Sequence, residues 1–450
     1  MKKILILLIS LSISQFSISQ NKKSKEVKSE LAKINLSGLK FRSVGPALTA
    51  GRIADIAVNK NNPKIYYVAV ASGGLWKTQN SGNTFEPIFD NEGSYSIGCV
   101  KIDPNNEHTI WVGTGENNNQ RSVAYGDGVY RSLDDGKTWK NMGLKNSEHI
   151  GMIEIDPNNS NKIYVAAYGP LWKEGGERGL YFTKDGGKEW SLILETNKHT
   201  GINEVHIDPN DPSIIYATAH QRRRHVFTYV GGGVGSKIYK SSDSGKNWKE
   251  LTNGLPSAIK GRIGMDISPA NTDYLYALVE AENNKQGLYF SKNKGESWNK
   301  VNKYVTSGNY YQEVFCDPLD QNKVFFMDTW LHHTVDGGKT VVKTGEKSKH
   351  VDNHCIWIDS KDTDHWIVGC DGGLYETWDH ASNWHYKPNL PITQFYKVAV
   401  DNDYPFYNIY GGTQDNNSIG GPSRTISNHG ILNSDWYITN GGDGFESAVD

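Results

Sequence analysis

One turn motif recurs along the sequence and restricts the possible folds more than any other feature. In residues 128–139, GVYRSLDDGKTW, a short apolar strand runs into a Ser-x-Asp-x-Gly-x-Thr-Trp turn. The Ser and Asp side chains can bond within the turn, Gly136 supplies a positive φ, and Trp139 begins the return strand. The motif therefore predicts a hairpin tip. Its copies begin at Thr78, Ser132, Thr183, Ser241, Ser291, Thr334 and Thr377.

A second element repeats between these turns: an alternating strand, an Asp-Pro-Asn type of turn and another strand, as in VKIDPNNEHTIWVGTG and IEIDPNNSNKIYVAAYG. Each unit then has four strands, and successive copies of the first turn start 43 to 58 residues apart. This is the period of a β-propeller blade. We therefore predict an all-β propeller of four-stranded blades, with eight repeats and the start of a ninth. One ring of eight to ten blades and a seven-bladed ring leading into a second both fit.

The two ends of the sequence set the expected domain limits. Residues 1–19 combine two lysines, an apolar run and small residues, which is typical of a cleavable signal peptide. Polar residues interrupt that run, so a membrane anchor is the weaker interpretation. Residues 20–40 are charged and read as a linker or short helix, and residues 41–450 carry the repeats. The final GFESAVD matches the lead-in to an Asp-Pro-Asn turn, so we expect the reading frame to continue past Asp450.

Composition excludes some classes of partner. With 48 basic and 50 acidic side chains, the formal charge of −2 argues against a nucleic-acid partner. Four cysteines are too few for a disulfide scaffold. Cys355 and Cys370 flank one predicted turn at matched distances, so a cross-strand disulfide and two buried free thiols are both open. No nucleophile elbow, Walker loop, HExxH or CxxC pair is present, and we expect no cofactor.

Antiparallel strands place the connections of a blade alternately on two faces. The Asp-Pro-Asn turns and the Ser/Thr-x-Asp turns share one face, where uniform length and chemistry indicate a scaffold. The loops between second and third strands and the links between blades share the other, variable face, which suits binding. We assign a structural role to the third residue of each repeated turn: Asn80, Asp134, Asp185, Asp243, Asn293, Asp336 and Asp379.

Planar amides, arginines and aromatic side chains on the variable face are what recognition of a glycan or a peptide backbone requires. Solvated polar loops are the alternative. The predicted ligand-binding residues are Glu116, Asn119, Arg121, Tyr125, Arg222, Arg224, Trp330, His332 and His354.

The same face holds carboxylates that hydrolysis of a glycosidic bond would need. The candidates are Glu116, Asp127, Asp371, Asp415 and Asp443. In an extended segment, His350, Asp352 and His354 project to one side, which is a spacing that can hold a metal. Hydrogen-bonded histidines lining a channel are the favoured interpretation of these three residues, so we predict no metal.

Several motifs resemble exported bacterial BNR/Asp-box repeat proteins, of the superfamily that includes the sortilin (Vps10-type) propeller and is often labelled glycosyl hydrolase. They include VASGGLWKTQNSG, VGTGENNNQRSVAYGDGVYRS, YGGTQDNNS and NGGDGFESAVD, and the resemblance covers about residues 41–450. It implies the propeller fold and either ligand binding or hydrolysis. The Asp-x-Gly-Gly expected to carry a catalytic carboxylate in xyloglucanases reads Ala71-Ser72-Gly73-Gly74 here. The GRI at Gly51 lacks the proline of a sialidase entry. No Cys-rich module of a sortilin receptor is seen up to Asp450, and the expected continuation of the reading frame leaves such a module open.

The sequence thus favours an exported propeller that binds an extracellular peptide, protein or glycan through its variable face. A xyloglucanase- or sialidase-like glycoside hydrolase is the alternative. A third interpretation is a structural propeller that docks onto a surface.

Overall fold

The computed structural model describes residues 38, 40–45, 48, 51–120 and 123–450. The chain divides into two compact units, residues 1–43 and 44–450, and every strand of the described residues belongs to the second unit. The predicted signal peptide and almost all of the predicted linker lie outside the described residues. No helix within the described ranges is long and apolar enough to cross a membrane.

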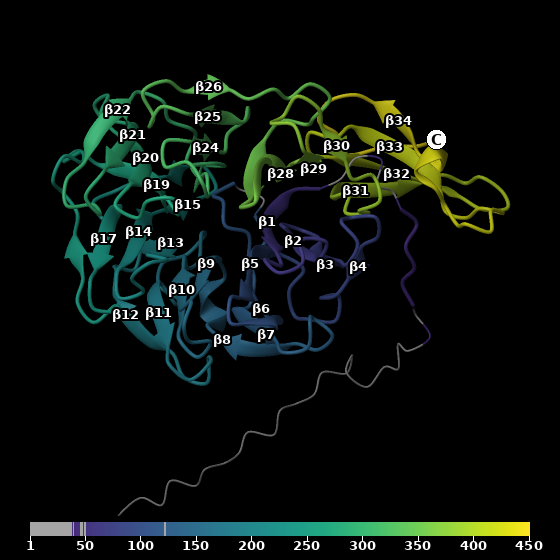
Figure 1. The fold of residues 1–450 in the computed structure, drawn as a ribbon. Helices are drawn as coiled ribbons and strands as arrows, with labels where there is room; N and C mark the ends of the chain where they lie inside the picture. Colours follow the sequence, from purple (N-terminus) through teal and green to yellow (C-terminus); the bar gives the residue numbers. More distant parts are fainter. Residues whose placement is uncertain (1–37, 39, 46–47, 49–50, 121–122) are drawn as a thin grey trace, which may run out of the picture. The chain divides into compact units, whose positions relative to one another are not determined.

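Eight four-stranded antiparallel sheets follow one another in the described part of the chain, with strands in sequence order (Figure 1). The first four sheets are β1 (Ile53–Val58), β2 (Tyr66–Val70), β3 (Gly74–Thr78), β4 (Glu86–Pro87); β5 (Ile97–Asp103), β6 (Asn106–Thr114), β7 (Val129–Ser132), β8 (Lys140–Gly143); β9 (Ile150–Ile155), β10 (Ile163–Ala167), β11 (Gly179–Thr183), β12 (Ser191–Leu194); and β13 (Thr200–Ile207), β14 (Ile215–Gln221), β17 (Lys237–Ser241), β18 (Lys249–Glu250).

The next four sheets are β19 (Lys260–Ile267), β20 (Leu275–Ala281), β21 (Gly287–Ser291), β22 (Asn299–Asn302); β23 (Val314–Cys316), β24 (Val324–Phe326), β25 (His332–Thr334), β26 (Val342–Lys343); β27 (Asn353–Asp359), β28 (Asp362–Cys370), β29 (Gly373–Thr377), β30 (His385–Tyr386); and β31 (Phe395–Val400), β32 (Asn408–Thr413), β33 (Ser418–Pro422), β34 (Tyr437–Asn440). A hairpin of β15 (Arg223–Arg224) and β16 (Tyr229–Val230) is inserted in the fourth sheet, and two 3-10 helices, η2 (Lys145–Ser147) and η3 (Asn433–Asp435), are also present. The predicted all-β fold of four-stranded units is confirmed.

The repeated turn has the same hydrogen bonds in each of the first seven sheets. In the second sheet, the N–H of Gly136 donates to Ser132 Oγ at 2.8 Å, and the N–H of Thr138 donates to Asp134 Oδ1 at 2.9 Å. The first of these bonds recurs in the other six turns, with lengths of up to 3.1 Å. The third residue of each turn is therefore held inside its own hairpin.

The tryptophan that follows the turn joins neighbouring sheets. The indole N–H groups of Trp139, Trp190 and Trp384 donate to main-chain oxygens in the last strand of the preceding sheet or just after it, at 2.7–2.8 Å. Each of these rings also packs beside buried residues between the two sheets. In these three copies one motif provides both the hairpin tip and a contact with the preceding sheet, so it helps to fix how these sheets stack.

The hydrophobic core consists of seven clusters of buried residues, and each lies between two of the first seven sheets. Six clusters join successive sheets, from the first and second to the sixth and seventh. The remaining cluster joins the first sheet to the seventh, where Ile53 and Val68 pack with Cys355, Ile367 and Leu374. The first seven sheets therefore follow one another in a ring.

The innermost strands of the first six sheets line a hollow of about 340 Å³. Three of its carboxylates accept a hydrogen bond from a main-chain N–H group of the next sheet. These pairs are Asp55 with Val100 (2.9 Å), Glu204 with Met265 (2.9 Å) and Asp266 with Cys316 (2.8 Å). The centre of the ring is thus polar, and its charges connect neighbouring sheets.

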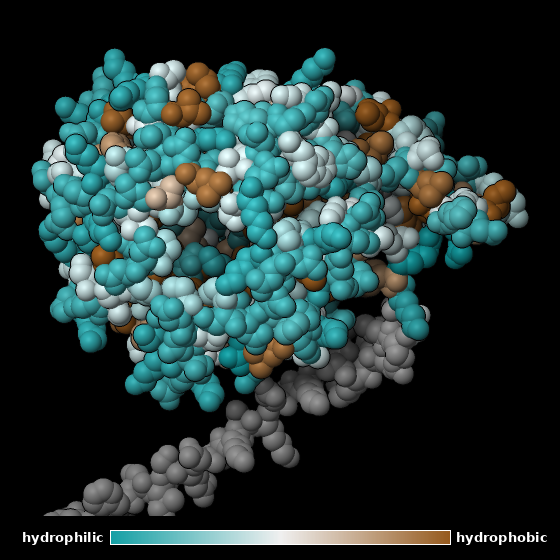
Figure 2. Space-filling view, viewed as in Figure 1, coloured by the Kyte–Doolittle hydropathy of each residue, from teal (hydrophilic) through white to brown (hydrophobic). Residues whose placement is uncertain are grey.

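The eighth sheet is packed differently. None of the seven clusters contains a described residue of β31–β34. Val398, Val400 and Ile438 are more than half exposed. Figure 2 shows hydrophobic side chains among hydrophilic ones on the surface over the region that Figure 1 labels β32–β34. Within the described residues, this sheet therefore contributes to none of the buried clusters of the ring.

All four cysteines are free and buried, so the disulfide left open by the sequence is not formed. A bulge in β27 places Asn353 opposite Cys370 and places Cys355 opposite Gly369. The two thiols are therefore not paired across the strands.

Candidate functional site

A buried arginine joins three sheets on the variable face. Arg52 precedes β1, and its guanidinium contacts both oxygens of Asp371, at 2.6 and 2.9 Å, in the connection between β28 and β29. It also donates to Glu116 Oε1, after β6, at 2.6 Å. His354 Nε2 lies 2.7 Å from Asp371 Oδ1, and Asn118 donates to Glu116. Burial raises the pKa of Asp371, but Arg52 and His354 outweigh this and hold the pKa well below its usual range.

The loop after β6, residues 116–120, spans the interior of the ring. The Asn119 side chain donates to the carbonyl of Gly308 at 2.7 Å, in the link that leads to the sixth sheet. From the fourth sheet, Arg222 donates to Asn119 Oδ1 at 2.7 Å, and Arg224 donates to the Asn119 carbonyl at 2.8 Å. The loop thereby covers part of the inner opening, and two predicted ligand contacts, Arg222 and Arg224, both donate to a third, Asn119.

Beside this loop lies a hollow of about 360 Å³, which we call the aromatic hollow. Its lining comes from three parts of the chain: Gln120, Tyr310, Tyr396, Gln414, Asp415, Asp443 and Phe445. The Tyr396 and Phe445 rings stack with centroids 5.1 Å apart and planes inclined by 16°. The Tyr396 hydroxyl donates to Gln414 Oε1 at 2.7 Å. The Arg52 guanidinium lies 5.8 Å from the centre of the Tyr310 ring, so the hollow adjoins the buried ion network.

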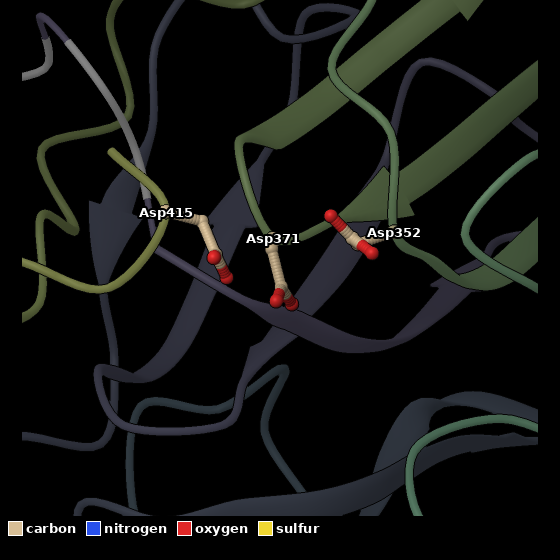
Figure 3. A group of neighbouring side chains, drawn as sticks. All are labelled: Asp352, Asp371 and Asp415. Atoms are coloured by element: carbon tan, nitrogen blue, oxygen red, sulfur yellow. The ribbon is translucent and has the colours of Figure 1, made fainter. Parts of the chain in front are cut away.

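Carboxylates converge at one side of the aromatic hollow. Figure 3 shows Asp371 between Asp352 and Asp415, and each of the three offers an oxygen within 4.8 Å of the others. The backbone N–H of Asp415 donates to Asp443 Oδ1 at 2.8 Å. Burial, together with the negative charges of Asp371, Asp443 and Asp352, raises the pKa of Asp415 to about 6. With this pKa, Asp415 can hold a proton close to neutral pH.

Other predicted residues lie away from this group. Tyr125 is 73% exposed. Asp127 accepts a hydrogen bond from Tyr130 at 2.6 Å within its own sheet. The Trp330 ring is covered by the Lys343 ammonium at 4.2 Å, and His332 bonds with Tyr304 at 3.0 Å. Arg121 lies outside the described residues.

The residues that the sequence offered as metal candidates, His350, Asp352 and His354, do not form one cluster. Among the described residues, the group whose geometry can hold a metal is Asp352, Asp371 and Asp415. Asp371 is already bound by Arg52 and His354, and Tyr311 donates to Asp352 at 2.5 Å. Burial lowers the pKa of His350, but the hydrogen bond and charge of Cys370, the hydrogen bond with the Val351 carbonyl and the charge of Asp371 together outweigh this and raise the pKa to about 9.

Sequence reasoning missed several residues of the site, namely Arg52, Tyr310, Tyr311, Tyr396, Gln414 and Phe445. The sequence analysis noted Arg52 only as part of the GRI segment at Gly51. Tyr310 lies in a link between sheets on the variable face, and an aromatic residue in such a link is a usable signal. The stacking of Tyr396 on Phe445 has no local signal, because 48 residues separate the two positions.

Comparison with known proteins agrees with this architecture. Residues 178–330 match the model of a family described as sortilin, neurotensin receptor 3. Over 250 residues the chain is 28% identical to sortilin of Rattus norvegicus, which covers 51% of this chain and 26% of that protein. Over 418 residues it is 22% identical to a xyloglucanase of Hypocrea jecorina, covering 76% of this chain and 49% of that protein. An ancestral GH74 enzyme of known structure superposes with a TM-score of 0.51 at 16% identity, covering 87% of this chain and 63% of that one.

The chain thus spans less than two thirds of the length of each of these proteins. At 16% identity the structural likeness shows the fold alone. Together with the family match and the two curated relatives, it supports a β-propeller of the BNR/Vps10 type.

Proposed function

We propose that the chain is an exported ligand-binding propeller and that it binds a glycan in the aromatic hollow. The observation that carries this proposal is the stacked pair Tyr396 and Phe445 beside Asp415, Asp443 and two glutamine amides. The apolar face of a sugar ring packs on an aromatic face. Carboxylates accept hydrogen bonds from the sugar hydroxyl groups, and amides can both donate to them and accept from them. A concave site with a few convergent polar groups is the usual form of a small-ligand site.

The buried residues that bond to Arg52 and to the loop of residues 116–120 have a different role in this proposal. Glu116, Asp371, Asn119 and Arg222 are bound to other protein groups and hold the floor and the covering loop in place. A fixed floor reduces the ordering cost of binding. These four residues are thus positioning residues rather than direct ligand contacts.

A peptide is the second candidate ligand for the same hollow. The match to a family described as a neurotensin receptor favours it, since that description names a peptide receptor. An extended peptide would use the same carboxylates and amides for its main-chain groups, and a side chain would take the aromatic position.

Hydrolysis of a polysaccharide is the alternative function, and one observation favours it. A carboxyl group with a pKa of about 6 has the property expected of a general acid, and Asp415 has it. The relatives include a xyloglucanase. The sequence of residues 71–74 argues against hydrolysis, because it reads Ala-Ser-Gly-Gly where the resemblance predicts a carboxylate.

Titration calorimetry with soluble glucan, xyloglucan and mannan oligosaccharides and a matched peptide panel tests the proposal. We expect Tyr396→Ala and Phe445→Ala to weaken glycan binding roughly tenfold or more, as for an anchor residue. Tyr125→Ala is the control, because Tyr125 is an exposed aromatic residue outside the lining of the hollow. Equal losses in Tyr125→Ala and Tyr396→Ala, or no glycan binding, would refute glycan binding in the hollow. Release of reducing ends that Asp415→Asn abolishes would establish the hydrolase instead.

We also infer that the chain is exported through residues 1–19 as a signal peptide, with residues 20–40 as the linker to the repeat region. The composition of the N-terminus supports this inference. Expression of the full chain with N-terminal sequencing of the mature protein tests it, and an intact Met1 in the extracellular fraction would contradict it.

A further inference from the structure

Among the described residues, the lining of the aromatic hollow contains two carboxylates and no basic side chain. Asp415 and Asp443 stand there with two glutamine amides and the rings of Tyr310, Tyr396 and Phe445. The main-chain N–H of Asp415 donates to Asp443 Oδ1 at 2.8 Å, which holds these two acidic residues next to each other. The hollow therefore offers a ligand negative charge and aromatic rings in one place.

The ion pairs of this region are made by other carboxylates. Arg52 pairs with Asp371 and with Glu116, each at 2.6 Å. One guanidinium between two carboxylates leaves an excess of negative charge, so Arg52 supplies no spare cation to the hollow. Asp415 and Asp443 form no ion pair within the described ranges.

Two histidines and a further carboxylate lie close to this group. His354 Nε2 is 2.7 Å from Asp371, and His350 Nδ1 lies 2.8 Å from a main-chain carbonyl oxygen. Asp352 accepts a hydrogen bond from the neutral hydroxyl group of Tyr311 at 2.5 Å. In the part of the chain that the structure describes, Asp352 thus adds a third negative charge that has no ion-pair partner.

The crowding of negative charge affects the protonation of Asp415. Burial and then the charges of Asp371, Asp443 and Asp352 raise the pKa of Asp415 to about 6. Each neighbouring carboxylate makes the ionised form of Asp415 less favourable. A positively charged ligand would have the opposite effect, so such a ligand and the ionised carboxylates would stabilise each other.

The aromatic rings favour an organic cation over a metal ion. Tyr396 and Phe445 stack with their centroids 5.1 Å apart, and the face of such a ring attracts an ammonium group. A hard metal ion instead takes several oxygen ligands. In the group of three carboxylates that Figure 3 shows, Asp371 is already bound by Arg52. An ammonium group carried by a sugar or a similar ring matches the lining better.

We propose that the ligand of the aromatic hollow is a glycan whose sugars carry free amino groups. This inference rests on the proposed glycan site and adds the class of sugar to it. An ammonium group has three donors and no acceptor, which matches the acceptor-only carboxylates of Asp415 and Asp443. The ring that carries the amino group packs on Tyr396 or Phe445. A hydroxyl or an acetamide group in the same place brings no charge to the hollow.

Titration calorimetry of the full chain with three matched tetrasaccharides tests the inference. Cellotetraose, chitotetraose and fully de-N-acetylated chitotetraose have the same backbone linkage and differ in the substituent at the second carbon: hydroxyl, acetamide or amine. We expect the amino tetramer to bind roughly fivefold or more tightly than the other two, through one ion pair and one cation–π contact. Added NaCl should reduce this preference, because salt screens charges that solvent reaches.

Asp443→Asn tests the origin of the preference. The amide keeps an acceptor for the N–H of Asp415 but removes the charge. The ratio of the affinities for the amino tetramer and cellotetraose should therefore fall by roughly two- to fivefold. Asp273→Asn, at an exposed carboxylate of the fifth sheet, is the matched control and should keep the wild-type ratio. An unchanged ratio in Asp443→Asn would overturn the inference.

The outcomes separate this inference from the proposed function. Equal binding of the three tetramers, all weakened by Tyr396→Ala, would overturn the amino-sugar inference and leave glycan binding in place. No binding of any tetramer would refute both. Tetralysine carries ammonium groups without a sugar ring and should bind more weakly than the amino tetramer. Tetralysine that binds as tightly would overturn the inference and assign the hollow to basic peptides. The wild-type comparison decides even if Asp443→Asn does not fold.

Discussion

Strands β1 and β31 hold the same first position in their sheets, but their surroundings differ. Four of the six residues of β1 are buried, because the second and seventh sheets cover it, whereas no residue of β31 is buried. Every residue of β34 is exposed. Yet the eighth sheet and the segments next to it supply five of the seven residues that line the aromatic hollow. The comparison indicates that stability resides in the ring, and that the proposed binding chemistry lies where the ring meets a less buried sheet.

The largest effect is expected from the arginine at the junction of the first, second and seventh sheets. Arg52→Ala leaves Glu116 and Asp371 buried without their cation, which typically costs about 3–5 kcal/mol of unfolding free energy. Urea denaturation measures this loss of unfolding free energy. Arg424→Ala, an exposed arginine near the eighth sheet, is the control and should change stability by less than about 0.5 kcal/mol. Equal effects of the two substitutions would contradict a ring closed by Arg52.

The contrast in burial can be tested with the same substitution in both regions. Ile53→Ala removes a fully buried side chain between the first and seventh sheets and should cost about 2–5 kcal/mol. Ile438→Ala, at a position 54% exposed in β34, should stay within about 0.5 kcal/mol. Chemical denaturation followed by Trp fluorescence compares them. A loss from Ile438→Ala as large as that from Ile53→Ala would show that the eighth sheet is packed like the others.

A smaller effect concerns the protonation of Asp415. Because its pKa in the folded chain is about 6, above the value of about 3.9 for an unfolded chain, the folded state binds the proton more tightly. Through this group the free energy of unfolding falls as pH rises from about 4 to about 6. Asp415→Asn should therefore be more stable than the wild type above pH 6, by less than about 1 kcal/mol because solvent that reaches the partly exposed side chain screens its charge.

Below about pH 4 the wild type and Asp415→Asn should have the same stability. Thermal melts across this pH range measure the difference, with Asp273→Asn, an exposed carboxylate of the fifth sheet, as the control. A difference between wild type and Asp415→Asn that does not change with pH would contradict the raised pKa.

The smallest effect lies in the turn of the seventh sheet. Its fifth position is Ala381 with a φ of +64°, where the other six turns have glycine. Ala381→Gly should raise the free energy of unfolding by up to about 1 kcal/mol, since an L-residue is strained there. Gly136→Ala is the reverse test and should destabilise, because its Cβ would lie 2.6 Å from Ile88. Stabilisation by both substitutions would contradict this account of the turn.

Much of the fold was predictable from the sequence because its signals are local. The spacing of the Ser/Thr-x-Asp turns predicts four-stranded units, and their hydrogen bonds span only four residues, as between Ser132 and Gly136. Ring closure has no such signal. It depends on contacts such as Ile53 with Cys355, which are about 300 positions apart. The sequence therefore left open both a seven-bladed ring and a larger one.

The candidate site was predictable only in part, because its contacts also join residues that are far apart in the sequence. Glu116, Asp371 and His354 were placed on the variable face, and the structure brings them together. Arg52 donates to the carboxylates of Asp371 and Glu116. Because Arg52 is 319 positions from Asp371, no local signal in the sequence showed that this carboxylate is already paired within the protein. Asp415 was a candidate whose neighbours the sequence did not reveal.

The measurement that tests the central claim most directly is hydrogen–deuterium exchange of the full chain with and without a saturating oligosaccharide found in the binding panel. We predict slower exchange in peptides that contain residues 396, 414–415 and 443–445, with unchanged exchange in the buried strands of the ring. Protection confined to residues 222–231 or to the ring, with the eighth sheet unaffected, would contradict the account and place the ligand elsewhere.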